Sequence, residues 1–235
     1  MRTGGKICTC PVAPGGEWSH PVVMVTCQIL EARSRLCQLD PILNETCRIV
    51  TGCIKTTPVH CLYALSGIAP PDIRRAVITK AERTKQANDN RHSLHEHSAA
   101  QKRLSSRSSF LDTTEVLETT QTDARITEWQ NQWNSLGSQT TQWMERGINP
   151  DKCLTTGHDQ PWAVWKTLNR LRVGEGRCKV SMKKRKITSV ACVCGESQTT
   201  EHIMRCSQAP QCTGDDLAEP NAAALACANH WKDVI

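Results

Sequence analysis

The sequence has little of what a large apolar core or a membrane anchor needs. Of its 235 residues, 38% are hydrophobic, and phenylalanine and tyrosine occur once each, as Phe110 and Tyr63. No apolar run approaches the roughly 20 residues of a membrane-spanning helix. The segment from Pro21 to Val25 is too short for the hydrophobic region of a signal peptide. We therefore expect an intracellular protein, in the nucleus or cytoplasm, without a membrane partner.

Recognisable catalytic motifs are also missing. The sequence contains no glycine-rich phosphate loop and no Ser/His/Asp constellation, and no small-molecule substrate is evident. Polymerases hold two metal ions with carboxylates, and the chain has one adjacent aspartate pair, Asp215 and Asp216. This pair has no flanking apolar strands, and Glu219 and Pro220 follow at once. We expect no catalytic residue, and no enzyme activity from this chain alone.

Cysteine, by contrast, is abundant, with fourteen residues. Such a number fits either a disulfide scaffold or reduced thiols with a metal site. The absence of a recognisable signal peptide favours reduced thiols. Four residues, Cys192, Cys194, His202 and Cys206, follow the spacing Cys-x-Cys-x7-His-x3-Cys. Three thiolates and one imidazole are a ligand set for a tetrahedral structural Zn²⁺ with no open position.

The spacing leaves alternatives open at this zinc site. Gly195 permits the sharp turn that presents two sulfurs to one ion. A single residue between Cys192 and Cys194 is tighter than the usual two, so Cys178 or Cys212 remain alternative ligands. Free thiols without metal are the competing interpretation.

Positive charge is concentrated just before this motif. Nine lysines and arginines lie between Lys166 and Lys186, and Glu175 is the one acidic residue among them. The net charge of +6 also favours a polyanionic partner, and phosphate neutralisation gives salt-dependent binding. A solvated helix face or a nuclear-import-like run is the alternative. We predict binding to RNA or single-stranded DNA through Arg170, Arg172, Arg177, Lys179, Lys183, Lys184, Arg185 and Lys186.

Helical patterns dominate the rest of the chain. Asp40 and Pro41 are typical of a helix start, Thr57-Pro58 and Pro70-Pro71 begin two more helices, and Gly67 ends the first of these two. We expect a further helix from Thr113, capped by Asp112. Two tryptophan stripes predict core rather than base stacking. Their members are Ile126, Trp129, Trp133 and Leu136, and then, between Pro161 and Gly174, Trp162, Trp165, Leu168 and Leu171.

These patterns predict a mainly α fold: a loose helical assembly with a small C-terminal zinc-knuckle-like loop. We expect an irregular segment at 1–33, a helical region at 34–87 and a Ser/Asn-rich linker at 88–111. The three histidines of the linker, His92, His95 and His97, are interpreted as chance neighbours. The remaining regions are tryptophan-containing helices with the basic segment at 112–187, the Cys/His loop at 188–212, and a tail at 213–235.

Two blocks of the sequence resemble a known family. The downstream block comprises Arg170-Leu-Arg-Val-Gly174, Gly176-Arg-Cys178, Cys192-Val-Cys-Gly195, Gln198-Thr199, Glu201-His-Ile203 and Cys206. The upstream block comprises Leu39–Glu45, Arg48–Lys55, Leu65–Pro71 and Ile73-Arg74-Arg75. Together they are similar to the C-terminal region of jockey-type non-LTR retrotransposon (LINE) reverse transcriptases.

This resemblance implies an origin in an RNA-directed DNA polymerase, with residues 34–87 following the polymerase palm as a thumb-like region. It implies Cys192, Cys194, His202 and Cys206 as ligands of a nucleic-acid-binding knuckle. Val173 departs from the family, which usually has threonine there. The polymerase palm is missing, so we expect a nucleic-acid-binding fragment. The alternatives are part of a longer product with an upstream catalytic domain, or a decayed element without selected function.

Overall fold

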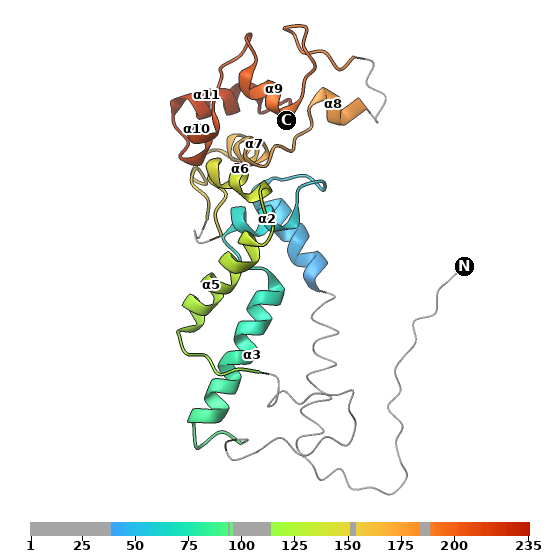
Figure 1. The fold of residues 1–235 in the computed structure, drawn as a ribbon. Coiled ribbons are helices and arrows are strands. Elements are labelled where there is room, and N and C mark those ends of the chain that lie inside the picture. The colour runs from blue at the N-terminus through green and yellow to red at the C-terminus, as the bar shows by residue number, and fades with distance from the viewer. Residues whose placement is uncertain (1–38, 94, 96–113, 151–153, 184–188) are drawn as a thin grey trace, which may run out of the picture. The chain divides into compact units, whose positions relative to one another are not determined.

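The computed structural model describes residues 39–93, 95, 114–150, 154–183 and 189–235, which belong to one unit spanning Gln38–Ile235. This part of the chain is mainly helical, as predicted (Figure 1). Its β structure is an isolated antiparallel bridge between Ala191 and Ser197. No helix in these ranges combines the length and apolarity needed to cross a bilayer. Residues 39–51 are helical, and the labelled helices are α2 (Val59–Ser66), α3 (Pro71–Asn88), α5 (Gln121–Asn134), α6 (Gln139–Glu145), α7 (Trp162–Val173), α8 (Lys179–Met182), α9 (Thr200–Arg205), α10 (Gly214–Ala218) and α11 (Ala222–Trp231).

Prolines and glycines set the helix boundaries where the sequence predicted them. Helices α2, α3 and α7 each follow a proline: Pro58, Pro70 and Pro161. Proline has a backbone angle suited to this place and no N–H to leave unpaired. Helices α2 and α7 end at Gly67 and Gly174, whose φ values of 66° and 78° are left-handed. These three predicted helices are confirmed.

Two predicted helix starts are wrong. Asp40 does not cap the first described helix, because Leu39 and Asp40 are already helical. The Asp40 carboxylate instead accepts hydrogen bonds from Arg75 at 2.7 and 3.0 Å. Asp112 and Thr113 lie outside the described residues, and 114–120 are not helical. Helix α5 begins later, where the Thr120 side chain accepts a hydrogen bond from the backbone of Asp123.

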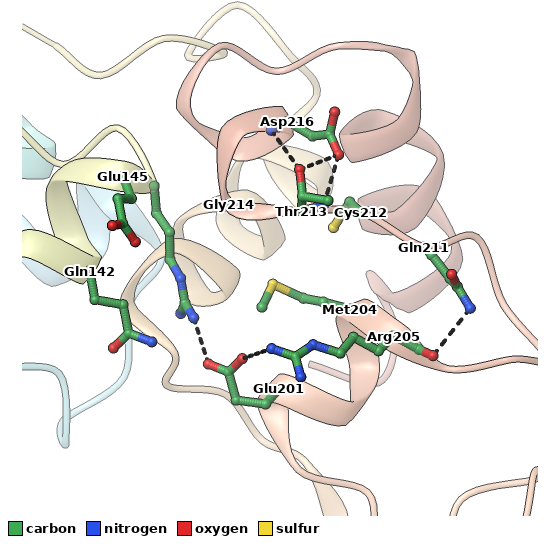
Figure 2. Close-up of a pocket in the computed structure, with 11 residues that line it drawn as sticks. Gln142, Glu145, Glu201, Met204, Arg205, Gln211, Cys212, Thr213, Gly214 and Asp216 are labelled. Atoms are coloured by element: carbon green, nitrogen blue, oxygen red, sulfur yellow. Dashed lines mark hydrogen bonds and ion pairs between the residues drawn. The ribbon is translucent and has the colours of Figure 1, made fainter.

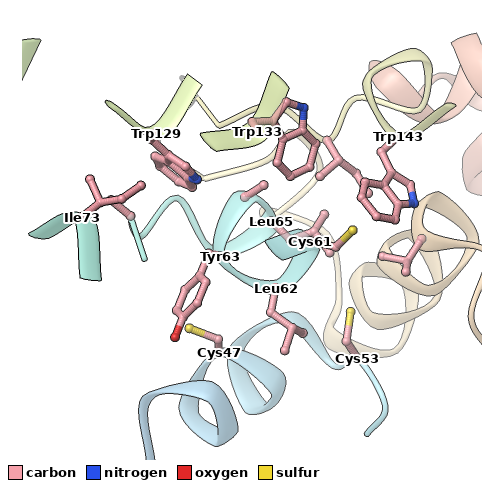
Figure 3. Packing of buried hydrophobic residues seen from close by; sticks show 14 of the residues in the cluster. Cys47, Cys53, Cys61, Leu62, Tyr63, Leu65, Ile73, Trp129, Trp133 and Trp143 are labelled. Carbon is pink, nitrogen blue, oxygen red and sulfur yellow. The ribbon is translucent and has the colours of Figure 1, made fainter. Parts of the chain in front are cut away.

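A first hydrophobic cluster, here the tryptophan core, is built from residues 39–51 and helices α2, α3, α5 and α6. Helices α3 and α5 run alongside each other (Figure 1). The rings of Trp133 and Trp143 lie 5.7 Å apart, and Leu65 of α2 lies close to Trp133 (Figure 3). Trp129 and Trp133 are 5% and 2% exposed, so the prediction that this stripe is core is confirmed.

A second cluster, here the knuckle core, gathers α7, α9, α10 and α11 around Leu168, Leu171, Ile203 and Leu217. Cys192 and Cys206 of the predicted zinc loop belong to the same cluster, whose list also includes Trp231. The loop is therefore packed onto helices rather than standing alone. Trp162 was predicted to join the apolar stripe of α7, but it is the first residue of that helix and is 53% exposed.

Side chains of α7 complete the end of the first described helix. The last carbonyls of a helix have no partner within the helix. Trp165 Nε1 donates to the Val50 carbonyl at 3.0 Å, and Asn169 Nδ2 donates to the Thr51 carbonyl at 2.9 Å. Helix α7 therefore holds residues 39–51 in place through polar contacts as well as through packing.

The predicted linker and N-terminal segment lie largely outside the described residues. Of the three linker histidines, His97 lies outside. His92 Nε2 is 3.1 Å from Glu82, and His95 Nδ1 is 3.2 Å from the Gln86 carbonyl. Both contacts are with α3. In the part of the chain that the structure describes, these two histidines belong to no metal-ligand cluster.

Candidate metal centre

A tight loop and a short helix bring the four predicted ligands together. The loop closes with hydrogen bonds from the Gly195 N–H to the Cys192 carbonyl at 3.0 Å and from the Cys192 N–H to the Glu196 carbonyl at 2.7 Å. Gly195 has a φ of 97°, a conformation that glycine adopts readily. Helix α9 then presents His202, and its start is fixed by Thr199, whose hydroxyl accepts from the His202 N–H at 3.0 Å.

The ligand atoms of Cys192, Cys194, His202 and Cys206 all lie within 4.8 Å of one another. The Sγ atoms of Cys192 and Cys206 are 3.8 Å apart, and Cys194 Sγ is 3.2 Å from His202 Nε2. Zn–S bonds of about 2.3 Å at tetrahedral angles separate two sulfurs by about 3.8 Å. The cluster can therefore hold a metal ion, and one sulfur–sulfur edge already has the tetrahedral length.

A carboxylate orients the histidine. His202 Nδ1 is 2.9 Å from Glu196 Oε2. Donation from Nδ1 to this carboxylate leaves the Nε2 lone pair facing Cys194, and such a partner commonly fixes the tautomer of a ligating histidine. The sequence analysis did not identify Glu196. A carboxylate next to the loop glycine, six residues before the histidine, was the signal that pointed to it.

The crowding of thiols changes their acidity. Burial tends to raise the pKa of Cys192, but hydrogen bonds from the Cys194 backbone and from the His202, Cys206 and Cys194 side chains lower that pKa to about 6. Burial and the Cys192 and Cys194 thiols raise the pKa of Cys206 to about 11. The cluster thus favours one thiolate before any metal binds, and a bound cation stabilises the others.

The two alternative ligands do not join the cluster. Cys178 Sγ lies 3.4 Å from Ser181 Oγ and 3.9 Å from Thr200 Oγ1. Cys212 neighbours Cys227, and this contact together with burial raises its pKa. Among the described residues, the metal-ligand group consists of the four residues that the spacing singled out.

Arg170 and Arg172 were predicted to contact phosphate, and for these two residues the prediction is wrong. Arg172 is fully buried; it donates to the Leu217 carbonyl at 2.9 Å and the Thr156 carbonyl at 2.8 Å. Arg170 is 8% exposed and donates to the carbonyls of Gly52 and Ile235. Their guanidinium groups donate hydrogen bonds to buried backbone carbonyls, which would otherwise lack donors.

The other predicted phosphate contacts divide into three groups. Arg177 and Lys183 are exposed. Lys179 is half-buried, and its Nζ donates to the Ala191 carbonyl at 2.6 Å, which ties α8 to the metal loop. Lys184, Arg185 and Lys186 lie outside the described residues. Of the predicted phosphate contacts among the described residues, Arg177 and Lys183 are therefore exposed, and Lys179 is partly exposed.

Asp216, the second of the adjacent aspartates, caps the start of a helix. Asp216 accepts hydrogen bonds from the Thr213 N–H and hydroxyl, both at 2.7 Å, while its own N–H donates to Thr213. This reciprocal capping box begins α10. The bonds from Thr213, then from Asn221, hold the pKa of Asp216 below its ordinary value.

A cleft of about 550 Å³ is lined by residues of α6, α9 and α10 (Figure 2). Arg146 of this cleft pairs with Glu201 at 2.6 Å, and Arg205 pairs with the same carboxylate at 3.8 Å. Glu145 and Asp216 add two further acidic side chains to the lining. Because Glu201 engages both cations, the cleft is poorly suited to phosphate.

Comparisons of the chain with protein-family models, with curated proteins and with solved structures find no match.

Proposed function

We propose that this chain binds nucleic acid and that a structural Zn²⁺ closes its Cys/His loop. The observation that carries the proposal is the convergence of four ligand atoms within 4.8 Å, close in sequence to exposed cations. Three thiolates and one imidazole suit Zn²⁺ among the common divalent ions. Four protein ligands leave no position for a substrate or an activated water, so the metal orders the loop rather than taking part in a reaction.

Ordering the loop also organises the basic side chains. Lys179 is tied to the loop through the Ala191 carbonyl at 2.6 Å, and Val180 N–H donates to the Gln198 carbonyl. Helix α8 is thereby held against the loop, with Arg177 just before it and Lys183 just after it. Metal binding would fix these cations in one place, which reduces the entropy lost when they contact phosphates.

We further propose that the chain derives from the C-terminal region of a jockey-type non-LTR reverse transcriptase. The two sequence blocks in the family's order support this. The Arg170-Leu-Arg172 part of the resemblance has a structural explanation, since both arginines bond backbone carbonyls. Val173, which departs from the family, is 7% exposed and packs in the tryptophan core.

Metal content and salt-dependent binding test the proposal together. We expect one zinc per purified chain, and loss of that zinc in Cys194→Ser and His202→Ala. His158→Ala is the matched control, because His158 is exposed and lies outside the cluster. Affinity for a fluorescent single-stranded oligonucleotide should fall with salt, with a log–log slope of about −0.7 per neutralised phosphate. A metal-free chain that binds equally well, or a salt-independent affinity, would contradict the proposal.

A further inference from the structure

Trp162 differs from every other tryptophan that the structure describes. Its side chain is 53% exposed, whereas Trp129, Trp133, Trp143, Trp165 and Trp231 are between 2% and 9% exposed. A tryptophan buries a large apolar area when it is covered, and it is a frequent anchor where a partner covers it. An indole left in water at the start of a helix is therefore a candidate contact point.

Positive charge lies on the same side of α7. Lys166 is four residues after Trp162, and residues at this spacing are neighbours on a helix face. Burial, followed by the charges of Arg170 and Arg177, lowers the pKa of Lys166, while Asp233 opposes the effect. Lys166 and Arg177 form no hydrogen bond or ion pair among the described residues. Positive charges outnumber the one acidic group, Asp233, around Lys166, so the site has a net attraction for an anion.

The Arg170 charge adds to this field although its donors are used. Arg170 bonds the carbonyls of Gly52 and Ile235, so it is held beside Lys166 rather than reaching into solvent. Lys166 itself is closely packed, since a Cβ on Gly52 would lie 2.6 Å from its Cγ. The stem of Lys166 on helix α7 is thus held against Gly52, and the residue is half-buried.

An exposed indole beside free cations is the combination used by proteins that bind single strands. Bases stack on the aromatic ring while cations contact the phosphates, and the stacking tolerates any base because each has a π face. A duplex keeps its bases stacked inside and cannot use the indole in this way. Helix α7 has 12 residues and is about 18 Å long, so it can contact only a few nucleotides.

We propose that Trp162 is a stacking platform for an unpaired base, with Lys166 contacting a phosphate of the same strand. This inference rests on the proposed nucleic-acid binding and deepens it, because it names single-stranded RNA or DNA as the partner. It also places a contact residue in α7, outside the Cys/His loop and outside the basic run.

Abasic oligonucleotides separate stacking from charge. We would measure the fluorescence anisotropy of zinc-loaded full-length chain with three 12-nucleotide probes: a base-containing single strand, an abasic strand of equal charge, and a duplex. RNA and DNA versions of the single strand would distinguish the two sources. Wild-type protein should bind the base-containing strand at least fivefold more tightly than the abasic strand. Trp162→Ala should abolish this difference, and Trp162→Phe should restore most of it.

The controls distinguish base stacking on Trp162 from the proposed nucleic-acid binding as a whole. Ile78→Ala removes another exposed apolar side chain, 62% exposed on α3, and should change nothing. Lys166→Gln should weaken both single strands equally and reduce the salt slope by about one. Equal binding of base-containing and abasic strands by wild-type protein, with normal salt dependence, would overturn stacking and leave the proposed function standing. Absence of binding to all three probes would overturn both.

Discussion

The two cores of this protein are closed by different chemistry. The tryptophan core joins residues 39–51 to α2, α3, α5 and α6 through aromatic and aliphatic side chains, with Trp133 2% exposed at its centre. The knuckle core combines two short helices of six and five residues, α9 and α10, with α7 and α11, and it includes a loop with four converging candidate ligands. Short helices are marginal on their own. The first core is held by apolar burial, and the second combines apolar burial with a cluster of four residues that could hold a metal ion.

If a metal is bound, its removal should destabilise the knuckle core and leave the tryptophan core folded. A structural zinc contributes an apparent binding free energy of about 10–16 kcal/mol in small peptides, more than any single side chain here. With a chelator at neutral pH, we expect α9 and α10 to lose hydrogen-exchange protection while α2 and α3 keep theirs. Exchange measured by mass spectrometry on peptides from both cores checks this. Equal loss in α2 would show that the two cores unfold as one unit.

A substitution in the tryptophan core should lower stability without affecting the metal. Trp133→Ala removes an indole that contacts Trp143 at 5.7 Å between ring centroids, and it should reduce the free energy of unfolding by about 3–5 kcal/mol. Zinc content should remain one per chain. Urea denaturation gives the stability. Trp162→Ala is the matched control and should change stability by less than about 0.5 kcal/mol, because that side chain is half exposed.

A smaller loss is expected at Arg172 in the polar centre of the knuckle core. Arg172→Met leaves the carbonyls of Leu217 and Thr156 without their donors, while it removes a buried charge whose pKa burial lowers to about 10. The two effects oppose each other, so we expect a net destabilisation of about 2 kcal/mol. Arg177→Met, at an exposed position, is the comparison in the same denaturation experiment. A more stable Arg172→Met variant would show that desolvation of the charge dominates.

The smallest effect concerns pH and the surface of the tryptophan core. The hydrogen bonds from Arg75 hold the pKa of Asp40 below its ordinary value of 3.8, against a weaker opposing effect of burial. A lowered folded-state pKa contributes stability that is present above 3.8 and is lost as pH falls through the folded value. Asp40→Asn should therefore cost roughly 0.5 kcal/mol at neutral pH.

The pH dependence supplies the check on that prediction. The difference between wild type and Asp40→Asn should shrink as the pH falls below about 4, and thermal unfolding from pH 7 to pH 2.5 measures it. A constant difference across this range would mean that the carboxylate charge contributes nothing. Loss of zinc at low pH would affect the knuckle core. The unfolding of the tryptophan core should therefore be followed separately, by hydrogen exchange of peptides that contain Trp129 and Trp133.

Local rules in the sequence predicted many of the helices and the ligand set. Proline before a helix and glycine after it act within a few residues, which is why the boundaries at Pro58, Gly67, Pro161 and Gly174 were correct. The start of α5 was misplaced because two acceptable caps, Asp112 and Thr120, compete in the same stretch. Nothing local distinguishes them, and packing of Trp129 and Trp133 against α3 selects the helix that forms.

In the basic segment, the positions of charged residues in the sequence do not show which side chains are exposed to solvent. Arg170, Arg172 and Arg177 belong to the same basic segment of the sequence. The first two are nevertheless buried, and the third is exposed. Helix α7 turns two arginines toward backbone carbonyls of Gly52 and Leu217, which are 118 and 45 residues away in the chain. Long-range acceptors of this kind leave no pattern in the sequence.

The sequence by itself determined a mainly helical chain and a metal-ligand spacing, because both depend on residues a few positions apart. Tertiary structure alone decided which arginines serve the interior, that the Cys/His loop packs on α7 and α11, and that Trp162 stays in solvent. Those outcomes depend on contacts between distant segments, where a polar group takes the nearest buried acceptor and an apolar group is covered only if a neighbouring element reaches it.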